Sequence, residues 1–293
     1  MTDETRTWRR VSRGVVWITF GTFLLLTTLD LLPWSYWWSL VPFWPVLLVM
    51  LGLRLTFSRS RVPALVLLSP LLLIATMTWV AVSGPGWPTG PAWPVEVSRN
   101  PDAERWTFQG DLAMVELDLR AAGLAPELLL EGETRGQRGR PDLLLYGGDT
   151  RPRLRVRNFR GGRLLPWQSS WWGELRGTVA DDLPLDLDLD GGMIRGRVDL
   201  TGVPLERARL DGALQDLTLA LGPPEVDTTI RLRGAFNRLE LVVPEETPVR
   251  SWTDGLFNVV DGRREASRLR GPAYRLDVEG LFNWVEVRSP DLP

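Results

Sequence analysis

A short unit that recurs between residues 183 and 287 most constrains what this chain can fold into. Four copies open with a glycine and read Gly212-Ala-Leu-Gln, Gly234-Ala-Phe-Asn, Gly255-Leu-Phe-Asn and Gly280-Leu-Phe-Asn. A looser copy begins at Gly192. The four glycines lie 22, 21 and 25 residues apart, a period that is typical of stacked repeat architectures. The sequence therefore predicts a stack of similar units.

Each copy is predicted to form one rung of a β-stack. Apolar and polar residues alternate, as in Leu239-Glu240-Leu241, which places them on opposite faces of a strand. Turns such as Gly222-Pro223-Pro224 separate two such runs, and the repeated glycine permits a positive φ at a corner. Stacked rungs would align equivalent side chains. The predicted apolar column is Leu214, Phe236, Phe257 and Phe282, and the predicted amide ladder is Gln215, Asn237, Asn258 and Asn283.

Composition argues against catalysis. Among the 293 residues there is no His and no Cys, which excludes thiol nucleophiles, Ser–His pairs and ordinary zinc sites. The formal net charge of -2 gives no indication of nucleic-acid binding. We therefore expect no enzyme activity, no cofactor and no nucleic-acid partner.

The first 82 residues contain three apolar runs with lengths typical of membrane helices. They predict transmembrane spans at 14–32, 37–57 and 62–82 after a tail at 1–13. Because arginines cluster in the tail and around the 58–61 loop, both are predicted to be cytoplasmic. A linker at 83–99, rich in Pro, Gly and Trp, would lead to an extracytoplasmic β-repeat domain at 100–293. This predicts a multi-pass protein of the bacterial cell membrane, although a re-entrant hairpin for the first two runs stays open.

Two charged patterns are candidate sites. Asp186, Asp188 and Asp190 precede a glycine as in a calcium loop, but Arg197 stands where that loop requires Glu. Leu187 and Leu189 alternate with the carboxylates as in a strand, which is the favoured explanation and leaves a metal site as a weak candidate. Arg153, Arg155 and Arg157 would share one strand face and suit an anionic partner, or would neutralise nearby acidic residues.

An aromatic loop follows the arginines. Trp167, Trp171 and Trp172 lie in the segment 164–172. Exposed, these side chains would dock a partner, a glycan or the bilayer surface, and folded in, they would cap the open end of the stack. The sequence leaves both alternatives open.

Several stretches of the chain share the pattern of one protein family: Leu31-Leu32-Pro33-Trp34 and the run 44–52, the segments 111–118 and 126–132, the Gly-x-Phe-Asn rungs and Val243-Pro244. In these stretches the chain resembles the LiaF-like, toast-rack family of bacterial envelope-stress regulators. It implies membrane helices followed by an all-β, stacked-rung, β-solenoid-like domain with a regulatory or scaffolding role and no catalysis. No binding residues of the family correspond to positions of this sequence.

Together these features predict a membrane-anchored, non-catalytic envelope-stress sensor, regulator or binding protein. Its expected partners are the lipid bilayer and another envelope or signalling protein or an anionic wall polymer. A self-associating scaffold of the cell envelope, built as a homo-oligomer through open rungs, is the first alternative. A carbohydrate-binding module is the second.

Overall fold

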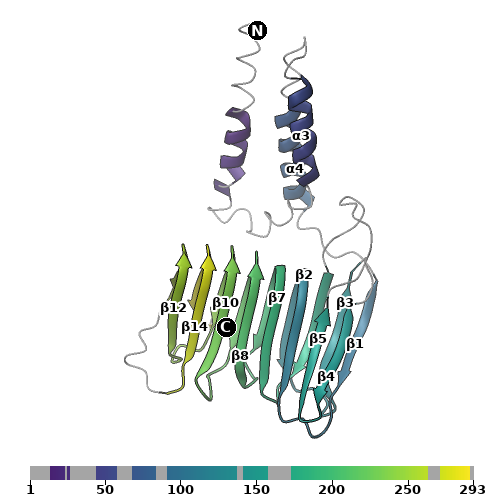
Figure 1. Cartoon of the computed structure of the whole chain (residues 1–293), viewed down its shortest axis with the longest axis vertical. Coiled ribbons are helices and arrows are strands. Elements are labelled where there is room, and N and C mark those ends of the chain that lie inside the picture. The colour runs from purple at the N-terminus through teal and green to yellow at the C-terminus, as the bar shows by residue number, and fades with distance from the viewer. Residues whose placement is uncertain are drawn as a thin grey trace. The chain divides into compact units, whose positions relative to one another are not determined.

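The computed structural model describes residues 14–23, 25–26, 44–57, 68–83, 91–136, 141–157, 173–262 and 271–290. They belong to two compact units (Figure 1): the described helices lie in one and the strands in the other. The predicted tail at 1–13 and the predicted site residues Trp167, Trp171 and Trp172 lie outside the described residues.

The helices are short. Residues 14–23 and 25–26 are helical, α3 spans Trp44–Phe57 with 14 residues, and α4 spans Leu68–Ser83 with 16 residues. At 1.5 Å per residue, α3 and α4 are about 21 and 24 Å long, whereas the hydrocarbon core of a bilayer is about 30 Å thick. Among the described helices, none has both the length and the apolar character needed to cross a membrane. The predicted spans at 14–32, 37–57 and 62–82, and with them the multi-pass membrane location, are contradicted by this finding.

Two prolines lie near the described starts of these helices. Pro45 is the second residue of α3 and Pro70 is the third residue of α4. Proline lacks an amide hydrogen and is favoured in the first turn of a helix, where that hydrogen has no partner. The predicted spans counted each whole apolar run as helix, whereas the described helices α3 and α4 contain 14 and 16 residues.

The fifteen strands of the described residues belong to one sheet (Figure 1). The strands are β1 Ala92–Ser98, β2 Trp106–Ala122, β3 Leu128–Arg135, β4 Asp142–Gly148, β5 Arg151–Arg157, β6 Gly173–Ala180, β7 Leu185–Leu200, β8 Leu205–Ala213, β9 Asp216–Leu221, β10 Thr228–Ala235, β11 Arg238–Val242, β12 Val249–Leu256, β13 Val259–Asp261, β14 Tyr274–Leu281 and β15 Trp284–Arg288. From β2 onward most neighbours pair in parallel and in register, while β1, β3 and β4 pair antiparallel.

The sheet has two arms that meet at a line of corners. The first arm runs β4-β5-β2-β7-β8-β10-β14-β12, and the second runs β1-β3-β6-β2-β7-β9-β11-β15-β13. The long strands β2 and β7 contribute one half to each arm. Buried side chains of both arms form one apolar core, with Phe108 and Leu187 from the first arm and Leu117 and Leu239 from the second.

The sheet is open, which corrects the predicted fold class. Its ladder ends at β12 and β13 on one side and at β1 and β4 on the other. The β-solenoid-like, toast-rack prediction extended the later rungs over the whole domain, but the antiparallel pairs β1–β3 and β4–β5 depart from that pattern. In addition, β1 begins at Ala92, inside the stretch that was predicted to be a linker.

The corners confirm the role expected for the repeated glycines. Gly212, Gly234, Gly255 and Gly280 all have positive φ, between +110° and +143°. The residue two positions later is left-handed as well, for example Phe236 with φ 58°. Because the corners stack in register, a Cβ on Gly234 would overlap the backbone carbonyl of Gly212. Glycine is therefore required by conformation and by space.

The predicted column and ladder both form beside these corners. Phe236, Phe282 and Phe257 stack with centroid distances of 5.1 and 4.8 Å, but they stand exposed on the corner rather than in the core. In the ladder, the Asn237 Nδ2 donates to Asn283 Oδ1 and the Asn283 Nδ2 donates to Asn258 Oδ1, each at 3.0 Å. Asn237 and Asn283 are buried, so this ladder satisfies polar groups that water does not reach.

The order of the rungs differs from their order in the chain. The last rung in sequence, β14 with β15, lies between β10–β11 and β12–β13. The inward side chains explain this order: β14 presents Leu276 and Val278, which are fully buried, whereas the corresponding residues of β12 are Ser251 and Thr253. The strand with apolar inward residues is central, and the strand with polar inward residues forms the edge.

Outward charges favour the same order. Arg233 Nε lies 2.7 Å from Glu279, and Arg231 lies within 4 Å of both Asp277 and Glu279. These pairs join β10 to β14 across the exposed face of the first arm. Cross-strand pairs of opposite charge stabilise adjacent strands by roughly 0.2–1 kcal/mol each.

Candidate functional site

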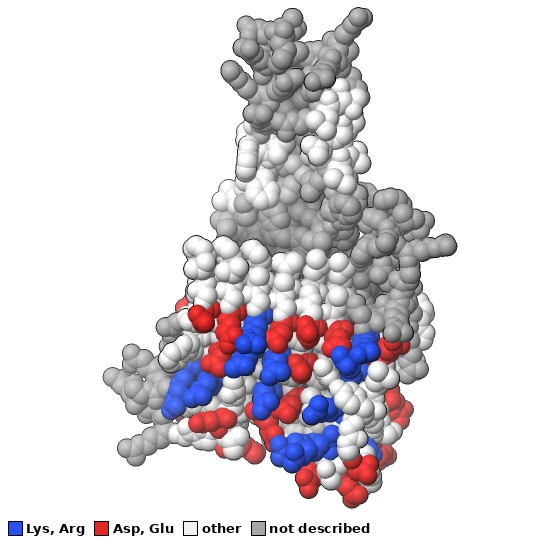
Figure 2. All heavy atoms as spheres, in the orientation of Figure 1, with Lys and Arg blue, Asp and Glu red and all other residues white. Residues whose placement is uncertain are grey.

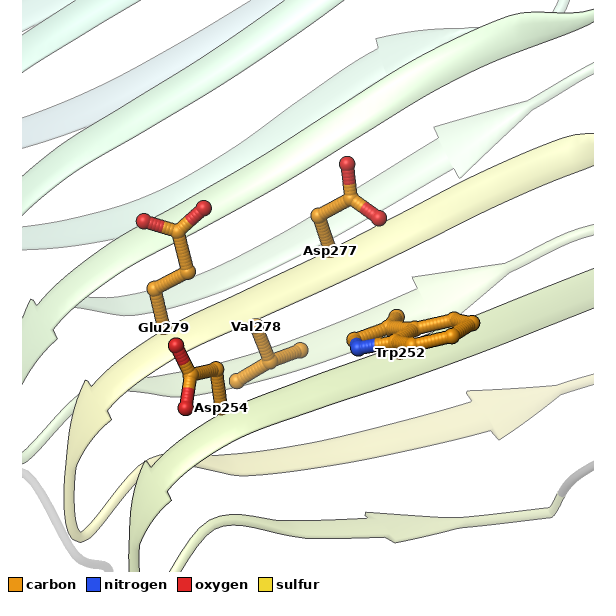
Figure 3. A pocket seen from close by; sticks show the side chains of 5 residues that line it. All are labelled: Trp252, Asp254, Asp277, Val278 and Glu279. Carbon is orange, nitrogen blue, oxygen red and sulfur yellow. The ribbon is translucent and has the colours of Figure 1, made fainter.

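A hollow at the open edge of the first arm is the candidate site. It is lined by Trp252, Asp254, Asp277, Val278 and Glu279, and its volume is about 310 Å³. In Figure 3, Trp252 and Asp254 project from one strand, and Asp277 and Glu279 project from its neighbour. Charged side chains also gather more widely on the face of the β unit seen in Figure 2, below an uncharged band.

Strand alternation and register build this hollow. Along β12, Arg250, Trp252 and Asp254 are exposed, while Val249 is buried. The parallel register places Trp252 beside Asp277 and Asp254 beside Glu279. Neighbouring strands lie about 4.8 Å apart, so an indole and three carboxylates occupy a compact two-by-two arrangement.

The electrostatics of the hollow favour a cation. Arg231 and Arg233 partly neutralise Asp277 and Glu279 from one side. Within the described residues, the Asp254 carboxylate has no ion-pair partner, and the Trp252 side chain is 76% exposed. A guanidinium or ammonium group placed here would contact an indole face and a carboxylate, which are two features that attract organic cations.

Within the described part of the chain, the edge beside the hollow presents backbone groups that no neighbouring strand pairs. Among the described strands, β12 pairs only with β14, and β13 pairs only with β15. The carbonyl of Pro248 accepts a hydrogen bond from the Tyr274 amide, and the carbonyl of Leu256 accepts one from the Phe282 amide, so the even-numbered residues of β12 face β14. Successive residues of a strand direct their backbone polar groups to alternate sides. The amides and carbonyls of Val249, Ser251 and Thr253 therefore point to the open side.

Apolar side chains continue this exposed surface. Leu256, Phe257 and Phe282 are 62%, 70% and 48% exposed. Large exposed apolar side chains that cluster at one place mark interaction surfaces, and a long unprotected edge strand is a template for strand addition. The edge of β12 thus combines backbone, apolar and acidic recognition elements.

The predicted metal candidates do not come together. Asp186, Asp188 and Asp190 alternate along the outer face of β7, so consecutive carboxylates lie about 6.7 Å apart at the backbone. Across the part of the chain that the structure describes, no group of three or more Asp or Glu residues has the arrangement of a metal site. Strand alternation accounts for these three residues.

The carboxyl of Asp188 is nevertheless perturbed. Burial raises its pKa, Arg209 on β8 opposes that rise, and Asp211, Asp190 and Asp111 add to it. Burial also raises the pKa of Asp199 in the second arm, but hydrogen bonds from Thr201 and Arg197 outweigh burial and lower it overall.

These opposite shifts predict opposite effects of removing the charge. For Asp188 the native pKa lies above the ordinary 3.8, so stability is lost as pH rises through the raised value. The free energy of unfolding of Asp188→Asn should then exceed that of wild type at pH 7 by less than about 1 kcal/mol, and the two should be equal at pH 3.

For Asp199 the native pKa is lowered, so the stability that its carboxylate contributes is present above pH 3.8 and is lost as pH falls through the lowered pKa. Asp199→Asn should destabilise at pH 7. Urea unfolding at both pH values checks this, and equal destabilisation by both variants at pH 7 would contradict it.

The predicted arginine face is partly used inside the sheet. Arg155 Nε donates to Asp111 Oδ2 at 2.8 Å, and Arg157 lies 3.5 Å from the same carboxylate. Arg153 is exposed on the same strand, β5. Two of the three guanidiniums therefore hold β5 to β2, as expected for residues that neutralise acidic neighbours.

None of the four polar and aromatic side chains of the hollow was among the residues predicted from the sequence. Trp252 and Asp254 stand in the most exposed rung, and Asp277 and Glu279 stand in the rung next to it. The alternation in 249–256 was an available signal, because it predicts that Arg250, Trp252 and Asp254 share a face. Their neighbours could not be predicted without the order of the rungs.

Comparisons with known proteins add little. The chain matches no protein-family model, and no curated protein matches it. Among solved structures, it is similar to a "putative cell adhesion protein" from Clostridium sporogenes, with 11% identity and a TM-score of 0.48. That similarity covers 69% of this chain and 100% of the other.

Proposed function

We propose that this chain is a non-catalytic binding protein whose β unit captures an extended segment of a protein partner along β12. The observation that carries the proposal is the coincidence of unpaired backbone groups at Val249, Ser251 and Thr253 with the acidic, aromatic hollow beside them. An added strand would gain main-chain hydrogen bonds, and a basic side chain on it would enter the hollow.

The chemistry of the chain agrees with binding rather than catalysis. The sequence lacks His and Cys, and the acidic residues of the hollow are partly neutralised by Arg231 and Arg233. A role in envelope stress, implied by the resemblance to LiaF-like proteins, stays a prediction. Strand capture would suit such a role as well as a scaffold.

A pair of synthetic peptides tests the proposal on the full chain. The probe is an acetylated, amidated peptide Thr-Val-Thr-Arg-Thr-Val-Thr, and its control carries Glu in place of Arg. Isothermal titration calorimetry should show binding of the Arg peptide, with a Kd at least about tenfold lower than that of the Glu peptide, because the hollow is acidic. Equal binding of both peptides, or no binding of either, would contradict the proposal.

Trp252→Ala should raise the Kd of the Arg peptide about fivefold, since a cation–π contact contributes about 1 kcal/mol. Trp284→Ala is the matched control, because Trp284 is also exposed but belongs to the second arm. It should leave the Kd unchanged. An equal effect of both substitutions would show that the Arg peptide does not enter this hollow.

A further inference from the structure

We propose that the strand captured at this edge is β12 of a second copy of the chain, paired antiparallel about Trp252. This inference rests on the proposed function and names its partner. It is carried by the residues that β12 itself presents on its outer face, Arg250, Trp252 and Asp254. When two copies of this strand run antiparallel, the basic residue of each faces the acidic residue of the other.

The backbone selects the possible registers. Val249, Ser251 and Thr253 direct their polar groups to the open side, so a hydrogen-bonded antiparallel pair must bring these odd-numbered residues opposite one another. Pairing about Trp252 places Ser251 opposite Thr253 of the second copy, which satisfies this rule. It also brings together two hydroxyl side chains that can bond across the strands.

The outer face then selects this register among those the backbone permits. Arg250 lies opposite Asp254 of the second copy, and symmetry repeats this pair. Trp252 lies opposite its own equivalent. All three are non-hydrogen-bonded positions, where facing side chains are closest. Within the described residues neither Arg250 nor Asp254 has an ion-pair partner, so each is available for the other copy.

The hollow is completed by this arrangement. The guanidinium of Arg250 from the second copy reaches the space beside Asp254 and Trp252, which is the site for an organic cation described above. The two-fold axis of this pairing is perpendicular to the first arm. The second arms of both copies therefore lie on the same face of the sheet that the two first arms form. Isologous interfaces of this kind close as dimers and do not polymerise.

Charge reversal tests the inference by sedimentation of the full chain. Wild type should form dimers. Arg250→Asp alone and Asp254→Arg alone each place like charges opposite one another twice per dimer, so each should raise the dimer Kd at least about tenfold. The double variant should restore wild-type dimerisation, and so should an equimolar mixture of the two single variants, in which every facing pair is again opposite in charge. Association through another surface would not respond to these changes, so failure of the double variant and of the mixture would overturn the inference.

The peptide experiment separates this inference from the proposed function. A wild-type chain that remains monomeric at high concentration but binds the Arg peptide would overturn the second copy as partner and would leave strand capture intact. A chain that neither dimerises nor binds the peptide would overturn both.

Discussion

Replacing Gly234 by alanine is expected to lower the free energy of unfolding by at least about 4 kcal/mol. Gly234 has φ +130°, which residues with a side chain rarely adopt, and a Cβ there would overlap the backbone carbonyl of Gly212. The obstructing atom belongs to the backbone of the neighbouring rung, so it cannot move unless the stack opens. Gly212 and Gly280 flank this glycine in register on both sides, which leaves no room for relaxation.

Gly148→Ala is the control for that substitution. Gly148 ends β4, and a Cβ there would have no neighbour within 4 Å. It should change the free energy of unfolding by less than about 1 kcal/mol. Urea unfolding of the full chain, followed by far-ultraviolet circular dichroism, measures both. A Gly234→Ala variant that unfolds at the wild-type urea concentration would show that the corners do not stack as described.

Asn283→Ala should destabilise the chain by about 3 kcal/mol, because its amide bonds to rungs on both sides. Its Nδ2 donates to Asn258 Oδ1 at 3.0 Å, and its Oδ1 accepts from Asn237 Nδ2 at 3.0 Å. Asn237 is buried, so removing its acceptor leaves a donor that water cannot satisfy. The loss should therefore exceed that of an exposed hydrogen bond.

The matched control is Asn258→Ala, because Asn258 occupies the same position in the edge rung, has one neighbour in the ladder and is half-buried. Asn258→Ala should lower the free energy of unfolding by about 1 kcal/mol. Equal or larger destabilisation by Asn258→Ala in the same urea experiment would contradict the order of the rungs, since it would place Asn258 inside the stack and Asn283 at its end.

Features that depend on one rung were predictable from the sequence. The positive φ of the repeated glycines, the stacked phenylalanines and the amide ladder all follow from the spacing of Gly, Phe and Asn. The exposure of the phenylalanine column was not predictable. The left-handed residue that follows each corner turns its side chain to the outside, and the sequence does not specify this.

Features that depend on how the rungs are ordered were beyond the sequence. Chain order would place β12 beside β10, but β14 takes that position because Leu276 and Val278 need cover on both sides. The hollow exists only in the observed order, since Trp252 and Asp254 must lie beside Asp277 and Glu279.

The three predicted membrane spans failed for a different reason. Hydropathy measures only the composition of a run, whereas the described helices α3 and α4 contain 14 and 16 residues, fewer than a membrane span needs.

Hydrogen exchange along β12 tests whether this strand is an open edge that captures another strand. In the dilute full chain, the amides of Val249, Ser251 and Thr253 should exchange rapidly, while the amides of Trp252 and Asp254, which face β14, exchange slowly. A saturating concentration of the Arg peptide, or a high concentration of the chain itself, should slow the first set. Slow exchange of Ser251 and Thr253 in the dilute chain, or exchange that neither addition changes, would contradict the claim.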